Sequence, residues 1–372
     1  MRILLFGNPS TLHSNLAKGL RELGHEVRCI SHGTGWRRFP IDDICLERRT
    51  DINGKLAFLD YLFHALPILH KCKGYDIVQL SGPLFLELRG TQLKPFYEYL
   101  RRHNRKIIMG SFGDDYHFVD QMLHGNVMRY NDQVINGMVR QDEAAREQRA
   151  EWLHDSLHEV GISKYVAREC DAIVSCAYDY WVCYNKVYPE KLHYVPMPIV
   201  MEHDEATPMP VGKKVKLFVG IQRERMQYKG VDLMLRAAER VQRDYPDRVE
   251  LRTVENVPYL EYKQTMEGSD AIIDQLYSYS PGMNSLLAMS KGIVSIGGGE
   301  PECYAAVGED TLRPIVNVVP DEELIYQVIR DFVLHPEHID QMKRDSVEYV
   351  RRHHDYLKVA RQYEAIYRQL LM

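Results

Sequence analysis

Residues 3–30 have the sequence ILLFGNPSTLHSNLAKGLRELGHEVRCI, in which an apolar run, a helical pattern and a second apolar run follow one another. The run at 3–6 is typical of a short buried strand, and a turn made of Gly, Asn, Pro and Ser comes after it. Leucines then recur at helical spacing, at positions 12, 16, 20 and 23, until Gly24 ends the pattern. Residues 27–30 predict the next strand. A strand, a helix and a strand in this order form a parallel unit whose crossover is right-handed in nearly all known cases.

The same alternation continues along the chain and indicates two sheets. Apolar runs predict strands of a first sheet at 77–80, 106–109, 172–175 and 192–195, and strands of a second sheet at 215–219, 250–254, 271–274 and 293–296. The segment between these two sets is acidic, unpatterned and bracketed by prolines, which is typical of a linker. We therefore expect an α/β protein with two doubly wound Rossmann-like domains that face a cleft.

The expected domain boundaries follow from this pattern. The N-terminal domain covers residues 1–198 and carries a polar, helical insert at about 115–168, and such an insert is more often a lid or a substrate-facing element than an idle loop. The linker covers 199–212 and the C-terminal domain covers 213–372. The last helix is a candidate to pack back on the N-terminal domain.

Composition and charge exclude several classes of protein. The 372 residues include 47 Lys and Arg against 52 Asp and Glu, and a net charge of -5 argues against a dedicated nucleic-acid binder. The seven cysteines never occur as CxxC and the sixteen histidines never as HExxH, so we expect neither disulfides nor a metal site. No signal peptide and no spanning stretch of about 18 apolar residues is found. We expect a cytoplasmic protein. The sequence also allows peripheral contact with the inner face of a membrane, but not a membrane-spanning segment.

One apolar helical stretch leaves two interpretations open. Residues 58–69 contain leucines and phenylalanines at helical spacing, which favours a helix in the core. The alternative is a membrane-facing patch beside Lys71 and Lys73.

Three segments of the C-terminal half contain residues suited to binding a diphosphate. In the first, at 219–230, a strand ends in glycine and is followed by Arg223 and by Lys229 before a helix, and an Arg fork with a Lys charge suits phosphate oxygens. In the second, at 277–294, the free amides at the start of a short helix near Gly282 could hold the same group. The third, GGGEPE at 297–302, places three glycines and two carboxylates after a strand. Each segment taken singly also has a purely structural interpretation: the first as a basic loop, the second as a helix that packs in the core, and the third as a surface turn.

In order along the chain, these segments resemble the large family of retaining GT-B glycosyltransferases. That family has a Lys-Gly loop, a helix ending in Glu-Ala-Met-Ala-x-Gly-x-Pro-Val, and then Gly-Gly-x-Pro-Glu. The matching stretches here are KG at 229–230, LAMSKGIV at 287–294 and GGEPE at 298–302. Further stretches resemble the family outside these motifs, at 20–27, 170–175, 193–198, 320–324 and 335–337. The resemblance covers most of the chain except the insert.

The sequence departs from this family at two positions. The family usually has two glutamates eight residues apart, one toward the donor sugar and one toward the ribose, and the matching residues here are Tyr279 and Leu287. Either the donor is held by other residues, or transfer activity has been lost. The resemblance and the three segments together give these candidate donor-binding residues: Arg223, Lys229, Asp274, Gln275, Tyr279, Gly282, Met283, Asn284, Glu300 and Glu302.

The N-terminal domain supplies the candidate residues on the acceptor side. GSFGDDYH at 110–117 follows a strand and resembles the family's acceptor-side loop, so Asp114 or Asp115 could orient an acceptor hydroxyl and His117 could assist proton transfer. A helix N-cap aspartate beside a solvent histidine explains the same residues at least as well. The first loop adds three candidate acceptor contacts, and the second of them is also a plausible N-cap: Asn8, Ser10 and His13.

The resemblance implies a hexosyltransferase that moves a sugar from a nucleotide diphosphate sugar to a glycan or lipid-linked glycan, in cell-surface polysaccharide synthesis. It implies retention of anomeric configuration, no metal, and no cofactor besides the nucleotide sugar as co-substrate. Two alternatives stay open: a catalytically degenerate protein that binds nucleotide sugars or acts as a scaffold, and a nucleotide-sugar epimerase of the same fold. The base, the sugar, the acceptor and the oligomeric state are not determined by the sequence.

Overall fold

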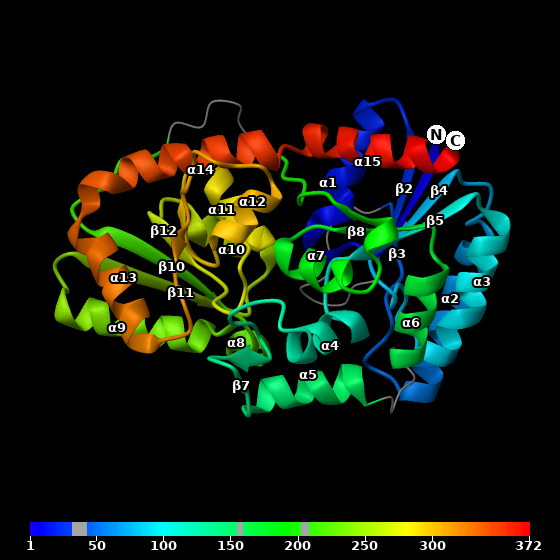
Figure 1. Ribbon diagram of the computed structural model, residues 1–372, viewed down its shortest axis with the longest axis horizontal. Coiled ribbons are helices and arrows are strands. Elements are labelled where there is room, and N and C mark those ends of the chain that lie inside the picture. The colour runs from blue at the N-terminus through cyan, green and yellow to red at the C-terminus, as the bar shows by residue number, and fades with distance from the viewer. Residues whose placement is uncertain (32–42, 155–158, 202–207) are drawn as a thin grey trace. The chain divides into compact units, whose positions relative to one another are not determined.

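A computed structural model describes residues 1–31, 43–154, 159–201 and 208–372 of the chain (Figure 1). The chain divides into two compact units. Unit 1 contains Met1–Gly125, Gln148–Pro198 and Tyr356–Met372, and unit 2 contains Asn126–Glu147 and Ile199–Asp355. Within the described residues, no helix is both long enough and apolar enough to cross a membrane.

Unit 1 is built on a seven-stranded sheet in the order β3-β2-β1-β4-β5-β8-β9, and every pairing in it is parallel. The strands are β1 (Arg2–Phe6), β2 (Glu26–Ser31), β3 (Ile44–Cys45), β4 (Ile77–Leu80), β5 (Lys106–Ser111), β8 (Ala172–Ser175) and β9 (Leu192–Tyr194). The helices are α1 (Leu12–Glu22), α2 (Gly54–His70), α3 (Gly90–His103), α4 (Tyr116–His124), α5 (Glu143–Leu153), α6 (Glu159–Glu169), α7 (Tyr178–Asn185) and α15 (Tyr356–Leu371), and the first residues of α5 belong to unit 2. The order is that of a doubly wound Rossmann-like sheet.

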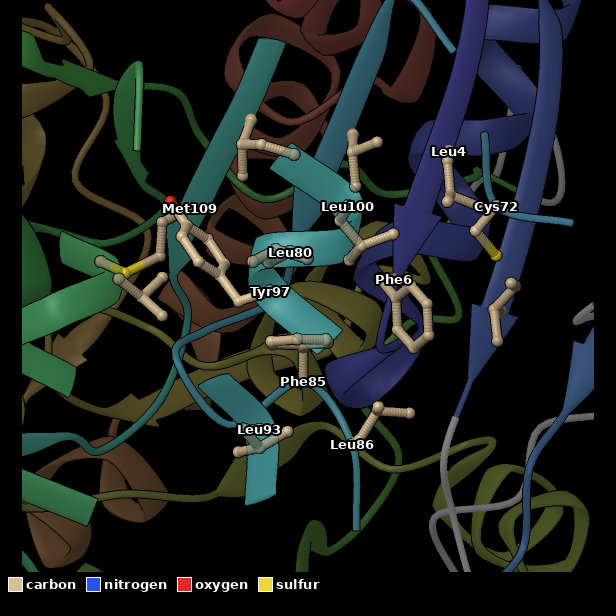
Figure 2. Packing of buried hydrophobic residues seen from close by; sticks show 14 of the residues in the cluster. Leu4, Phe6, Cys72, Leu80, Phe85, Leu86, Leu93, Tyr97, Leu100 and Met109 are labelled. Atoms are coloured by element: carbon tan, nitrogen blue, oxygen red, sulfur yellow. The ribbon is translucent and has the colours of Figure 1, made fainter. Parts of the chain in front are cut away.

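The core of unit 1 lies between this sheet and the helices α2, α3 and α6. Leu4 and Phe6 of β1 are fully buried there, because a parallel sheet is covered on both faces. Figure 2 shows this packing, in which the rings of Phe6 and Phe85 meet edge to face at 5.5 Å between centroids.

The last helix of the chain also packs in unit 1. A Cβ on Gly19 of α1 would lie 2.6 Å from Cβ of Ala360, so α1 and α15 approach as closely as glycine allows. Helix α15 is separate from the helix before it, since α14 ends at His353 in unit 2 and α15 begins at Tyr356 in unit 1.

Unit 2 is built on a five-stranded parallel sheet in the order β11-β10-β12-β13-β14. Its strands are β10 (Val215–Ile221), β11 (Val249–Glu255), β12 (Ala271–Ile273), β13 (Val294–Gly297) and β14 (Val316–Asn317). Its helices are α8 (Met226–Lys229), α9 (Val231–Asp244), α10 (Tyr259–Met266), α11 (Met283–Ser290), α12 (Pro301–Ala306), α13 (Glu322–Leu334) and α14 (Ile339–His353). Leu217 packs with α9 and α13 on one face of the sheet, and its neighbour Phe218 packs with α10 and α11 on the other.

The insert is divided between the two units. The expectation placed all of 115–168 in the N-terminal domain, but Asn126–Glu147 pack in unit 2 while α4 and α6 pack in unit 1. This segment contains the antiparallel hairpin of β6 (Val134–Ile135) and β7 (Met138–Val139). Its turn is Asn136-Gly137, with φ of 51° and 72°, the pair that a tight hairpin turn requires. Of the linker expected at 199–212, residues 202–207 lie outside the described part of the chain.

Candidate functional site

The order of strands in unit 2 places a candidate site at the carboxyl ends of β10 and β12. The chain leaves β10 toward β11 on one side and continues with β12 on the other, so the sheet reverses its winding direction between β10 and β12. In open parallel sheets, ligands bind at this reversal beyond the carboxyl ends. The loop after β10 leads to Lys229, and β12 is followed directly by Asp274.

Lys229 and Asp274 meet at this position. Lys229 Nζ lies 3.4 Å from Asp274 Oδ1, and Ser285 of α11 donates its hydroxyl to Asp274 Oδ2 over 3.1 Å. A Cβ on Gly282, which precedes α11, would lie 3.2 Å from Asp274 Oδ2 and 3.3 Å from Oε1 of Gln275. The start of α11, whose first backbone N–H groups have no partner within the helix, is therefore held against the carboxylate that also pairs with Lys229.

The remaining candidates of this loop and helix lie around that group. Gln275 donates its amide to the carbonyl of Ser280 over 3.0 Å, which folds the loop back on itself. Met283 and Asn284 form the first turn of α11 and are half-buried. The structure brings these residues together with Lys229, Asp274 and Gly282, as expected for loops at one edge of the sheet.

Arg223 is placed differently. Its guanidinium forms a two-pronged ion pair with Glu255 at the end of β11, with Nη2 2.9 Å from Oε2, and 73% of its side chain is exposed. Glu255 raises the pKa of Arg223 through this hydrogen bond. The diphosphate role that the sequence suggests for Arg223 would require it to leave Glu255.

The carboxylates of the GGGEPE turn are bound by Arg129 from the insert. Arg129 Nη2 lies 2.6 Å from Oε2 of Glu300, and its Nη1 pairs with Glu302. Glu300 also accepts hydrogen bonds from the hydroxyl of Tyr130 over 2.8 Å and from the side-chain amide of Asn317 over 3.0 Å. Glu300 is buried and Glu302 half-buried. Burial is the largest single influence on Glu302 and favours the neutral acid, but the hydrogen bond and the charge of Arg129 together with a backbone hydrogen bond outweigh it, and the pKa of Glu302 is lowered.

Tyr279 belongs to the same cluster. Its hydroxyl accepts a hydrogen bond of 2.7 Å from the backbone N–H of Arg129, whose guanidinium carbon lies 4.9 Å from the centre of its ring. The ring of Tyr130 lies 5.0 Å away, between centroids. Gly298 must be glycine, because a Cβ there would lie 2.2 Å from the carbonyl oxygen of Ser278. The loop after β12 and the turn after β13 are thus packed tightly, and Arg129 and Tyr130 close over both.

A second arginine of the insert binds the loop that carries Lys229. Arg140 lies 3.9 Å over the ring of Tyr277 and donates to the carbonyl of Gln227 over 3.0 Å. Its other partners include Asp142, at 2.9 Å, and 6% of its side chain is exposed. Arg140 therefore helps to position the short helix α8, which contains both Gln227 and Lys229.

In unit 1, the acceptor-side aspartates have structural partners. Asp115 caps α4 by accepting from the backbone N–H of Phe118 over 2.9 Å, and it accepts from the hydroxyl of Tyr184 over 2.5 Å. Burial raises its pKa to about 6. Asp114 accepts from the amide of Gln148 over 3.0 Å and is half-buried. The N-cap interpretation thus fits the geometry of Asp115.

His117 is buried rather than exposed to solvent. Its ring lies among those of Tyr116, Tyr184 and Tyr188, with centroids 5.1, 5.6 and 5.2 Å away. Burial lowers its pKa to about 4, and no hydrogen-bond partner of its buried Nε2 is found among the described residues. Proton transfer to an acceptor would require access that this environment does not provide.

Of the candidates expected on the first loop, Asn8 and His13 form hydrogen bonds within unit 1. Asn8 and Ser14 exchange two hydrogen bonds, of 2.5 and 3.1 Å, at the start of α1. His13 lies in α1 and not on the loop; it is fully buried, with Nδ1 2.5 Å from the carbonyl oxygen of Gly7 and Nε2 3.1 Å from the amide of Gln79. Ser10 is exposed and forms no side-chain cap, and its φ of 49° is strained for a non-glycine residue.

No family model matches the sequence, and no curated protein matches it. Solved structures do match over their whole length. Sucrose-phosphate synthase from Thermosynechococcus elongatus has 14% identity and a TM-score of 0.62, with 100% of this chain and 99% of that chain covered. S. aureus TarM, solved as a mutant in complex with fondaparinux, alpha-GlcNAc-glycerol and UDP, has 6% identity and a TM-score of 0.63 over 98% and 99%. Anabaena HepE in complex with UDP and glucose has 11% identity and a TM-score of 0.59 over 98% of each chain.

This chain has the GT-B glycosyltransferase fold.

Within this GT-B fold, the two residues that the resemblance sets against glutamates, Tyr279 and Leu287, have partners of their own. Tyr279 is 1% exposed. Its hydroxyl accepts the backbone N–H of Arg129, and the guanidinium of Arg129 lies over its ring. Leu287 packs against a cluster that includes Phe218 and Ile272. Neither side chain offers the carboxylate that the family uses.

Three residues of this site were missed from the sequence: Arg129, Tyr130 and Arg140. They lie in the insert, which no motif of the family covers, and each acts on unit 2 from a distant part of the chain. An Arg-Tyr pair in a polar insert is common, so the sequence gives little indication of which residues Arg129 and Tyr130 contact. Among the described residues of this GT-B chain, no group of three or more His, Cys, Asp or Glu is arranged to hold a metal ion.

Proposed function

We propose that this protein is a glycosyltransferase that moves a hexose-type sugar from a nucleotide diphosphate sugar to a glycan or lipid-linked glycan, in the synthesis of cell-surface polysaccharide. Transfer would retain the anomeric configuration and would require no metal ion. The GT-B fold supports the proposal, since TarM and HepE, which share it, were solved with UDP.

The observation that carries the proposal is the group formed by Lys229, Asp274 and the start of α11. A Lys ammonium has three N–H donors, and Asp274 lies 3.4 Å from Nζ, so the remaining donors can reach phosphate oxygens. Ser285 fixes the carboxylate and thereby the position of Lys229.

During transfer, negative charge builds up on the departing nucleoside diphosphate. Lys229 and the free N–H groups that follow Gly282 would stabilise this charge from fixed positions, which is commonly the largest contribution to catalysis. In this proposal Gln275, Met283 and Asn284 line the donor pocket. On the acceptor side, Asp114 is the half-buried carboxylate, whereas Asp115 and His117 are buried.

The experiment compares nucleotide binding by the wild type and two lysine variants. Isothermal titration with the diphosphates of uridine, guanosine, adenosine and thymidine identifies the base, and donor hydrolysis or transfer is then measured with the matching sugar nucleotide. Loss of one charged hydrogen bond weakens binding by about tenfold or more. We therefore expect Lys229→Ala to lower the affinity for the diphosphate by that factor. Lys213→Ala, at an exposed position of unit 2, is the matched control and should bind as the wild type does. Equal affinity and turnover of Lys229→Ala and the control would remove the diphosphate role.

A second candidate function is binding of a nucleotide sugar without transfer. It is favoured by Tyr279 and Leu287 at the family's glutamate positions and by the ion pairs that Arg129 forms with Glu300 and Glu302. Calorimetric binding of a sugar nucleotide with no turnover across glycan and lipid-linked acceptors would support this candidate. No binding of any of the four diphosphates would leave a scaffold role.

A further inference from the structure

Helix α2 has apolar side chains on two opposite faces. One face packs in the core of unit 1 through Ala57, Tyr61, Ala65 and Leu69, which follow one another at steps of four residues and are at most 3% exposed. The sequence also offers a core position for the other leucines and phenylalanines of 58–69, but one helix can direct only about half of its surface into a core. The interpretation of this stretch as a core helix therefore holds for one face.

The opposite face of α2 is exposed and apolar. Leu56, Leu59, Phe63 and Leu66 are 58%, 60%, 76% and 51% exposed. Steps of three, four and three residues place them in a single stripe along the helix. No part of the chain that the structure describes covers this stripe, and a row of four large exposed apolar side chains is uncommon on a free surface. We call these four residues the α2 stripe.

Both ends of the α2 stripe carry positive charge. Lys55 lies in the first turn of α2, and Lys71 and Lys73 follow its last residue, His70. In the described residues no ion pair is formed by any of these three lysines. The basic end of α3 is held beside this end of α2, because Tyr99 donates to the carbonyl of His70 over 3.0 Å.

Two aspartates lie close to the stripe along the chain, Asp60 within α2 and Asp51 before it. Asp60 is 29% exposed and lies near His64, with 3.8 Å between Oδ2 and Nδ1. Asp51, before the helix, is paired with Arg49 at 2.7 Å. An apolar stripe with lysines at its two ends is the pattern by which a helix lies in the interface of an anionic bilayer.

We propose that the α2 stripe binds the surface of an anionic phospholipid bilayer. Leu59 and Phe63 enter the boundary between headgroups and acyl chains, and Lys55, Lys71 and Lys73 contact the headgroup phosphates. A second copy of this chain fits less well. Pairing of two α2 stripes in either direction brings lysines against lysines, which is unfavourable, whereas an anionic bilayer neutralises both ends. This proposal does not depend on the proposed function, since binding to lipid needs neither donor nor acceptor.

The experiment is co-sedimentation of the full chain with vesicles of phosphatidylcholine alone or in an equal mixture with phosphatidylglycerol. We expect binding to the mixed vesicles that weakens as salt is raised, since salt screens the lysine contacts. Leu59→Ser combined with Phe63→Ser should bind at least about tenfold more weakly. Lys71→Glu combined with Lys73→Glu should lose about fivefold or more for each charge. The matched control is Leu260→Ser, at a leucine of α10 in unit 2 that is 67% exposed, and it should bind as the wild type does.

Circular dichroism verifies that each variant is folded, and the two pairs of substitutions test the stripe and the charges separately. The proposal is overturned by equal binding of the Leu59 and Phe63 variant and the wild type, or by equal binding to both kinds of vesicle. It is also overturned if the wild type binds neither vesicle and sediments as a dimer that the same variant dissociates, because the occupant would then be a second copy.

Discussion

Replacement of Arg129 by alanine should destabilise unit 2 by about 2 kcal/mol. An exposed ion pair contributes at most about 1 kcal/mol, and removal of one partner of a buried pair costs about 3–5 kcal/mol. This pair lies between the two cases, because 58% of the Arg129 side chain is exposed but only 8% of the Glu300 side chain. Glu300 would keep its hydrogen bonds from Tyr130 and Asn317, which limits the cost of leaving its charge without the arginine.

The assay follows unfolding of the full chain in urea by two signals. None of the three tryptophans of the sequence, at positions 36, 152 and 181, falls in the ranges of unit 2, and Trp152 and Trp181 belong to unit 1. Fluorescence of these two residues therefore reports on unit 1, whereas far-ultraviolet circular dichroism reports on both units. With a slope of about 2 kcal/mol per molar urea, Arg129→Ala should lower the midpoint of the unit 2 transition by about 1 M. The fluorescence midpoint should not move.

A double-mutant cycle with Glu300→Gln tests the reasoning further. The glutamine keeps an acceptor for Tyr130 and Asn317, so the double variant should be more stable than the sum of the two single effects predicts, by about 1–2 kcal/mol. An additive cycle would show that Arg129 and Glu300 do not interact in solution. A circular dichroism transition that does not move with Arg129→Ala would refute the ion pair as a stabilising contact of unit 2.

Three further predictions concern buried groups. Lys343→Met should cost unit 2 about 3–5 kcal/mol, because Lys343 lies 2.5 Å from the buried carboxylate of Asp270, and adding Asp270→Asn should restore most of this in the same urea assay. Burial lowers the pKa of His13 to about 4, so the stability of unit 1 should be complete above pH 6.5 and fall by up to about 3 kcal/mol as the pH falls toward 4. His13→Gln should flatten that decline in fluorescence-detected unfolding, and an equal slope for both proteins would contradict it. Gly230→Ala should lower both the melting temperature and nucleotide affinity, because φ is +70° and a Cβ would lie 2.8 Å from Leu276, whereas Gly212→Ala meets no atom within 4 Å and should be neutral.

Most of the fold could be predicted from the sequence, because strands of parallel sheets are continuous apolar runs. The run at 3–6 becomes β1 and the run at 271–274 becomes β12 and its first following residue. Because such strands are buried on both faces, their composition alone reveals them. The short strands β3 and β14 carry no such run and were not predicted.

The candidate site could be predicted only where backbone topology positions it. Lys229, Asp274 and Gly282 come from loops at the carboxyl ends of neighbouring strands, and parallel topology brings those ends together whatever the side chains are. Arg223 lies on the same edge, but the direction of its side chain depends on which acidic partner is nearest, and Glu255 is the last residue of the neighbouring strand β11. The periodicity of a sequence does not predict which side chains form ion pairs of this kind.

The sequence by itself determined the two parallel sheets and the loops at their carboxyl ends, since periodicity and strand order depend on local composition and chain connectivity. Only the tertiary structure decided which unit holds Asn126–Glu147, because Arg129 finds Glu300 across 171 positions of sequence. It also decided which apolar face of α2 is buried, because the sequence places apolar side chains on both faces and packing alone selects one of them.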